Sequence, residues 1–143
     1  MRVFGYPLHP MLVHFPIAFW VGANACDAAA LLGVAGAWRL GWLMLALGVA
    51  AALPAAGAGM LELIHLPEDA APAANRHMLL MGSALTAYLI ALVLRSDGLA
   101  PIPDPSGLPI ALAAIGFFFL AWGGHKGAVM VYGHGVGRAP AKD

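Results

Sequence analysis

The sequence predicts an all-α integral membrane protein, a four-helix bundle whose helices cross the bilayer up-down-up-down. The first observation is composition, because 62% of the 143 residues are hydrophobic, only 10% are charged, and the mean hydropathy is +0.83. Such values lie far from those of a soluble domain. The second is the presence of four long apolar runs. They occupy nearly the whole chain, which leaves residues 1–143 as a single transmembrane domain.

Each run has about the ~20 residues that a helix needs to cross a hydrocarbon core of ~30 Å. The runs are Met11 to Ala35, Gly41 to His65, His77 to Leu94 and Leu108 to Tyr132. Apolar residues surround the whole circumference of each run, and the runs are too long for strands, so we expect helices. Prolines mark the last two connections as turns. No internal repeat is visible along the chain.

Two features of the first two runs bear on helix shape and packing. Pro16 and Pro54 lie inside their helices, where a missing N–H and a ring clash predict a bent axis. The bend is either tolerated in lipid or shaped around a cofactor. Small residues recur along the runs and predict faces where backbones approach closely. They include Ala18, Gly22 and Ala25 in the first run, Gly48 and Ala52 in the second, and Ala84, Ala87 and Ala91 in the third.

The charged residues and the lone cysteine exclude several function classes. The formal net charge is zero, so no basic patch indicates nucleic acid. Cys26 is the single cysteine, which excludes an internal disulfide and a four-thiolate iron–sulfur cluster. The chain also lacks the C-x-x-C-H sequence that attaches haem covalently.

The six histidines are the main indication of function. If the runs cross a membrane in alternation, all of them lie towards one face, near the ends of the helices. They are His9, His14, His65, His77, His125 and His134. Neutral imidazole binds iron, copper and zinc, and it relays protons near neutral pH. The chain therefore predicts a shared layer of metal-binding side chains.

A non-covalent haem b held by two histidines is the function we expect, with electron transfer as its purpose. His14 and His77 are the expected axial ligands of the haem iron, because both lie within about a turn of a helix start and so at similar depth. His134, His9 and His125 are alternative ligands, or contacts to haem propionates and protons. Such a protein is more an electron carrier than an enzyme, and its expected partner is a quinone or a redox protein.

Two other classes of function remain open. A non-catalytic structural or assembly subunit of a larger membrane complex would use its histidines only as anchors at the lipid–water interface. A copper- or zinc-binding protein would use the clustered imidazoles to hold a metal ion directly. Assembly into a homo-oligomer is compatible with all three classes.

Three charged residues near the helix ends also need partners, because ionisable groups in a membrane are costly unless paired. Asp27 is expected to pair with Arg39 or to help a proton enter. Glu62 is expected either to orient a histidine N–H or to end its helix near water. Lys126 is expected to extend to the membrane surface or to contact a haem propionate.

The distribution of Lys and Arg indicates the orientation. The histidine side carries Arg2, Arg76, Arg138 and Lys142, with Lys126 nearer the membrane, against Arg39 and Arg95 on the other side. By the positive-inside rule, both termini and the histidines are expected on the cytoplasmic side.

The chain opens with Leu8-His9-Pro10-Met11-Leu12-Val13-His14-Phe15-Pro16-Ile17-Ala18 and closes with Val131-Tyr132-Gly133-His134-Gly135-Val136-Gly137. These two ends resemble those of a family of small bacterial membrane proteins called domain of unknown function 2231. His9, His14, His77, Asp27 and His134 match positions associated with the family, whereas His125 and Glu62 depart from them. The resemblance implies a bacterial inner-membrane protein similar to small b-type cytochromes, and so favours haem without supplying its ligands.

Overall fold

The computed structural model describes residues 2–3, 6–103 and 105–136 and is almost entirely helical. Its helices are α1 (Leu8–Leu12), α2 (His14–Leu31), α3 (Ala37–Glu62), α4 (Ala71–Leu94) and α5 (Gly107–Gly133), with two short 3-10 turns, η1 (Leu63–His65) and η2 (Glu68–Ala70), between α3 and α4. Two small antiparallel hairpins pair β1 (Arg2–Val3) with β2 (Tyr6–Pro7) and β3 (Ser96–Asp97) with β4 (Ala100–Pro101). The predicted all-α class is confirmed.

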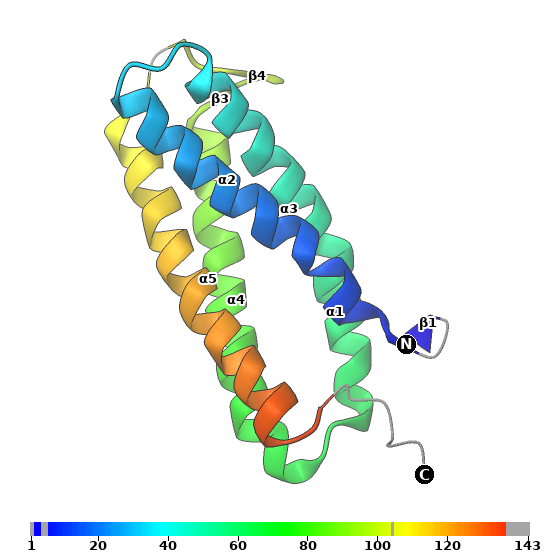
Figure 1. The fold of residues 1–143 in the computed structure, drawn as a ribbon. Coiled ribbons are helices and arrows are strands. Elements are labelled where there is room, and N and C mark those ends of the chain that lie inside the picture. The colour runs from blue at the N-terminus through cyan, green and yellow to red at the C-terminus, as the bar shows by residue number, and fades with distance from the viewer. Residues whose placement is uncertain (1, 4–5, 104, 137–143) are drawn as a thin grey trace.

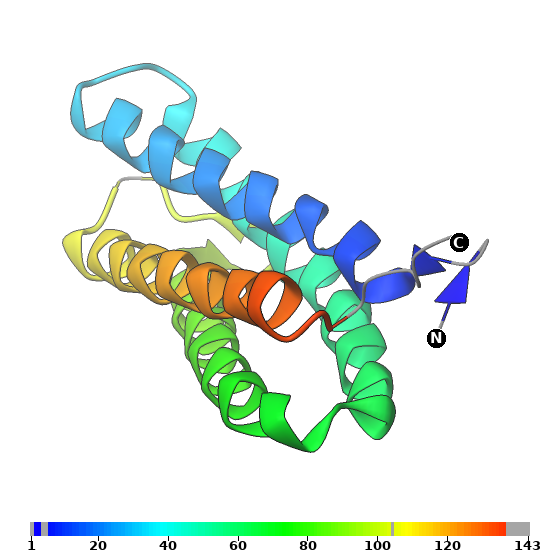
Figure 2. The ribbon, with the colours of Figure 1, turned by 60° about the horizontal axis from the view of Figure 1, so that its bottom comes forward.

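The four long helices pack as two hairpins side by side (Figure 1). α2 packs along α3, and α4 packs along α5, while α2 also contacts α5 and α3 contacts α4. α2 and α4 therefore lie diagonally across the bundle (Figure 2). One end of the bundle carries α1, the end of α3, the start of α4 and the end of α5, and we call it the histidine end. The opposite end, with the turn after α2 and the β3–β4 hairpin, is the loop end.

Three of the helical segments are long and apolar enough to cross a membrane. Within the described part of the chain they are Ala37–Glu62, Glu68–Leu94 and Gly107–Gly133. Large apolar side chains lie on their outer surfaces, such as Leu79, Val93 and Phe118, whose exposed fractions are 72%, 63% and 57%. A soluble monomer rarely leaves so much apolar surface open, whereas lipid covers it. α2 is shorter, with 18 residues, and carries the buried Asp27.

The first apolar run is divided, since α1 ends at Leu12 and α2 begins at His14. Pro16 explains the break, because its nitrogen carries no hydrogen for the carbonyl of Leu12, four residues earlier. At Pro54 the outcome differs, since α3 runs through this residue as one helix. The interruption at Pro16 is slight, since the backbone at Val13 remains helical and its N–H donates to the carbonyl of His9.

The buried core occupies the middle and the loop end of the bundle. It is a cluster of Trp20, Ala23, Leu45, Ala52, Ala84, Tyr88, Ala91, Ala113 and Leu120. At its centre the rings of Trp20 and Tyr88 stack with centroids 4.5 Å apart and planes at 18°. Their bulk fits because glycines lie against them, Gly48 against Trp20 and Gly116 against Tyr88. Among the described residues the cluster has no member after Ala52 in α3 or after Leu120 in α5, so it stops short of the histidine end.

The two hairpins are structural repeats of each other. Asp27 pairs with Arg95 at a separation of 68 positions, and the same offset relates two further pairs that meet across the bundle, Trp20 with Tyr88 and His9 with His77. It also relates Gly48 to Gly116. Residues on a two-fold axis meet their own equivalents, so an approximate two-fold axis runs along the bundle between α2 and α4. The sequence-based expectation of no internal repeat is wrong.

Candidate bis-histidine site

His9 lies in α1 and is held against α3. Its ring Nδ1 is 2.7 Å from the carbonyl oxygen of Ala55. A carbonyl can only accept, so Nδ1 carries the hydrogen and donates it, and in the neutral ring Nε2 then keeps its lone pair. One turn along α3, a Cβ at Gly59 would come within 2.9 Å of this same Nδ1. The imidazole therefore fits against α3 only because residue 59 has no side chain.

His77 in α4 is held against α5 in the same way. Its Nδ1 lies 2.8 Å from the carbonyl oxygen of Gly123, which fixes the same tautomer and leaves Nε2 as the available nitrogen. A Cβ at Gly127, one turn further along α5, would come within 3.1 Å of the His77 ring. Each histidine thus donates to a carbonyl 46 positions later in the chain and lies on the glycine one turn beyond it.

The two imidazoles face each other across the two-fold axis. Their ring centroids are 6.3 Å apart and their planes make an angle of 83°. Two imidazoles bound on opposite sides of one metal ion, with metal–nitrogen bonds of about 2.0 Å, have ring centres about 6 Å apart. Metal-binding histidines usually donate their other ring N–H to a carbonyl or carboxylate, as both do here. The separation of the rings is thus compatible with two nitrogen ligands that share one metal.

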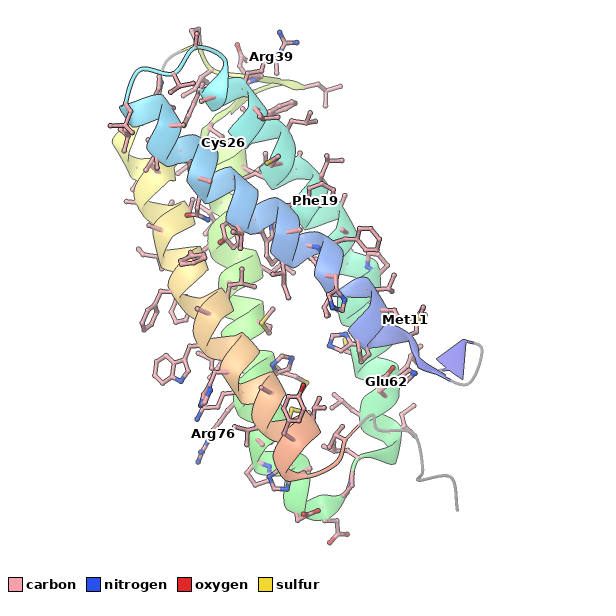
Figure 3. All side chains as sticks on the ribbon, in the orientation of Figure 1. Met11, Phe19, Cys26, Arg39, Glu62 and Arg76 are labelled. Carbon is pink, nitrogen blue, oxygen red and sulfur yellow. The ribbon has the colours of Figure 1, made fainter. Side chains whose placement is uncertain are left out.

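Glu62 supports the first of these histidines. Its Oε1 accepts the backbone N–H of His9 at 3.2 Å, so the end of α3 is tied to α1. Figure 3 shows Glu62 on α3 beside the start of the chain. The sequence predicts that Glu62 orients a histidine N–H or ends its helix, and in the structure the N–H that it binds is that of the backbone. Glu62 therefore positions the residue rather than the ring nitrogen.

The other histidines lie at the same end but outside this pair. His14 and His125 are exposed, and His134 has its Nδ1 3.2 Å from Oδ2 of Asp69. The side chain of His65 is outside the described part of the structure. The structure therefore brings His9, and not the expected His14, to His77. Helical period is the reason, because His9 lies 18 residues, about five full turns, before the buried Asp27, whereas His14 is five residues further on and lies on another, exposed face.

Asp27 has a different partner from the one expected. Arg95 donates two hydrogen bonds to its carboxylate, at 2.8 and 2.9 Å, and both side chains are almost fully buried. The guanidinium also lies 4.5 Å from the ring centroid of Trp38. The expected pairing of Asp27 with Arg39 is wrong, since Arg39 is exposed at the loop end. This ion pair joins α2 to the end of α4 and does not reach the histidine site.

Sequence reasoning missed the residues that hold the two imidazoles, namely Ala55, Gly59, Gly123 and Gly127. A signal for them does exist in the chain. Both His9 and His77 are followed at the same spacing by a glycine in the next long helix, and the two histidines are themselves 68 positions apart, like Asp27 and Arg95. This offset of 68 positions between equivalent residues indicates both the repeat and the histidine site.

No three His, Cys, Asp or Glu side chains gather into a metal-binding group among the residues that the structure describes. The site thus consists of two histidines, two backbone carbonyls and two glycines in an all-helical chain with apolar outer faces. These features are those of a small helical membrane protein.

Residues 5–140 match the family described as "Predicted membrane protein (DUF2231)". The match covers nearly the whole chain, so the chain belongs to this family, as the ends of the sequence suggest. No curated protein and no solved structure matches it.

Proposed function

We propose that the chain is a membrane electron carrier that binds one haem b between His9 and His77. The observation that carries this proposal is the matched presentation of the two imidazoles, each with Nδ1–H on a backbone carbonyl and Nε2 available. The proposal keeps His77 from the sequence-based pair and replaces His14 with His9.

The number of protein donors favours haem over a bare metal ion. Zinc in proteins is bound by three or four protein ligands, and the described residues offer two at this site. Haem brings four nitrogens of its own, so two histidines complete its coordination. Copper held by the same two imidazoles is the second candidate, and metal analysis separates the two.

The surroundings of the pair suit a flat apolar group. The cluster around Trp20 and Tyr88 ends before this level, and the helix beside His9 carries the small residues Ala55 and Ala58. Small residues allow a large planar ring to lie close to the backbone.

The equivalence of the two ligands bears on the reaction. When bound, haem supplies a one-electron couple whose potential depends on its axial ligands and surroundings. His9 and His77 would occupy both axial positions, which leaves none for oxygen or a substrate. The chain's own residues would then only hold the group and orient its two imidazole ligands, which is the task of an electron carrier.

We further propose that all four long helices cross the bacterial inner membrane up-down-up-down, with the histidine end at the cytoplasmic face. Three helices have the required length and hydropathy, and α1 with α2 would make the fourth crossing. Lys126 lies near the same end and could contact a haem propionate. A quinone or a redox protein at this face would exchange electrons with the site.

The test is the visible spectrum of detergent-purified protein, oxidised and then reduced with dithionite. The proposal predicts a sharp band of reduced six-coordinate haem, with about one iron and one porphyrin per chain. His9→Ala and His77→Ala should each abolish or displace the band. The matched controls His14→Ala and His125→Ala, at exposed histidines of the same end, should leave it unchanged. Colourless protein with bound copper would favour the metal-ion function, and protein with neither would favour a structural subunit.

A further inference from the structure

A pocket lies at the loop end, far from the two histidines. It has a volume of about 490 Å³, which is in the range of small-molecule sites. One wall comes from the start of α3, and the other from the β3–β4 hairpin and the residues after it. The first wall includes Trp38, Arg39 and Trp42, and the second includes Leu99 and Ile102.

The two walls are fixed to each other by hydrogen bonds. Trp38 donates its indole N–H to the carbonyl of Ile102 at 2.8 Å, and Trp42 donates its own to the hydroxyl of Ser96 at 2.7 Å. The backbone N–H of Ile102 in turn donates to the carbonyl of Arg95 at 2.9 Å. The polar edges of both tryptophans are thereby used within the protein, and the pocket is bounded by rings held in place.

The charge in this pocket belongs to Arg39. Its side chain is exposed and has no ion-pair partner among the described residues. It extends past the end of the bundle (Figure 3). The other arginine at this end, Arg95, is already neutralised by Asp27. Asp97 of the hairpin is exposed and is not among the residues that line the pocket. Among the described residues the pocket therefore offers one unpaired guanidinium beside walls of mixed polarity.

The internal repeat shows that this end is specialised. Residues 68 positions beyond Trp38, Arg39 and Trp42 are Ser106, Gly107 and Ile110, so the second hairpin has neither the arginine nor the tryptophans. The turn after α2 likewise has no counterpart of the β3–β4 hairpin in the described structure. The pocket thus occurs where the two halves diverge, in contrast to the histidine site, where they agree.

We propose that this pocket binds the phosphate of an anionic phospholipid from the surrounding bilayer. Arg39 would donate its forked N–H groups to the phosphate oxygens, a geometry that guanidinium and phosphate share. Leu99 is 96% exposed at the tip of the β3–β4 hairpin. Together with Trp42 it would lie at the level of the lipid glycerol and the upper acyl chains. A membrane protein with helix ends at the interface meets such lipids continuously.

The test measures lipid retained by the full chain after purification from mixed phosphatidylcholine and phosphatidylglycerol, by native mass spectrometry. Arg39→Gln should lower the bound phosphatidylglycerol about tenfold, the effect of one charge-assisted hydrogen bond. Arg39→Lys should recover part of the binding. The matched control is Arg76→Gln, which removes an exposed arginine at the histidine end and should change nothing. Circular dichroism of each variant verifies that the helices are intact.

Three results would overturn the proposal. Equal losses in Arg39→Gln and Arg76→Gln would show general charge attraction without a site. Unchanged retention in Arg39→Gln would remove the arginine from any role. Displacement of the lipid by millimolar inorganic phosphate would show that free phosphate, and not a lipid, is the preferred occupant. None of these measurements depends on haem, so the proposal stands or fails independently of the histidine site.

Discussion

Asp27 and Arg95 form a buried ion pair at the loop end of the same two-fold axis on which His9 and His77 face each other. The two residues occupy equivalent positions of the two hairpins but carry opposite charges. Two identical charges on the axis would repel each other. The opposite charges of Asp27 and Arg95 therefore favour packing of the α2–α3 hairpin against the α4–α5 hairpin over packing of either hairpin against a copy of itself. The axis therefore has an ion pair at one end, stacked rings in the middle and imidazoles at the other.

The first prediction concerns this ion pair. Arg95→Leu leaves the Asp27 carboxylate buried without a partner, and removal of one partner from a buried pair costs about 3–5 kcal/mol. Thermal unfolding of the purified protein in detergent should show a large fall in Tm. The exchanged pair, Asp27→Arg with Arg95→Asp, should recover much of the lost stability. A Tm for the exchanged pair no higher than that of the single variant would contradict a direct pairing.

The second prediction concerns the glycines beneath the imidazoles. Gly59→Ala and Gly127→Ala place a methyl group within 2.9 and 3.1 Å of the rings of His9 and His77, so the His9 ring must shift and the His77 ring must give by a few tenths of an ångström. Both variants should keep their helical content but bind much less haem, measured as absorbance per chain.

Neighbouring glycines provide the control for this experiment. A Cβ at Gly57 or Gly124 meets nothing within 4 Å, and alanine is favoured over glycine in a helix by up to about 1 kcal/mol. Gly57→Ala and Gly124→Ala should therefore bind as much haem as the parent protein. Equal haem content in all four variants would show that the imidazoles do not depend on these contacts.

The third prediction tests the internal repeat. Gly48 and Gly116 lie against the stacked rings of Trp20 and Tyr88, so alanine at either position overpacks the same layer from opposite sides. Each substitution should lower the free energy of unfolding, by about 1–3 kcal/mol. The effect should be larger at Gly48, where the approach is closer. A destabilised Gly48 variant beside an unaffected Gly116 variant would argue against equivalent halves.

The fourth prediction concerns the polar contact within the core. The amide of Asn24 donates to the hydroxyl of Tyr88 and to the carbonyl of Trp20, both at 2.9 Å. Tyr88→Phe leaves one buried amide hydrogen without this partner and should cost about 1–3 kcal/mol. Combining it with Asn24→Leu removes both groups, so the double variant should lose less than the sum of the singles. Strict additivity in chemical unfolding would show that the hydrogen bond contributes nothing.

The sequence predicts the helical class and the clustering of the histidines at one end, because both depend on local hydropathy and on the alternation of direction. The ligand pair is harder to predict. It depends on which face of the helix meets the bundle, and His9, about five turns before the buried Asp27, lies on that face while His14 does not. His77 lies in the same way about five turns before the buried Arg95 of the other hairpin.

The internal repeat was missed because the paired positions are complementary more often than they are identical. Asp27 corresponds to Arg95 and Trp20 to Tyr88, so a comparison of residue identity shows little. The partner of Asp27 was missed for a related reason. Arg39 is near in sequence, whereas Arg95 belongs to the other hairpin, and only the tertiary arrangement brings it to the carboxylate.

The most direct test of the histidine site is the electron paramagnetic resonance spectrum of the oxidised protein at low temperature. Two imidazoles at 83° to each other, both bound to one ferric haem, predict a single low-spin signal of the strongly anisotropic kind that nearly perpendicular axial ligands produce. That signal should disappear in His9→Ala and persist in His14→Ala. A high-spin signal in the parent protein, or a low-spin signal that survives the loss of His9, would contradict ligation by His9 and His77.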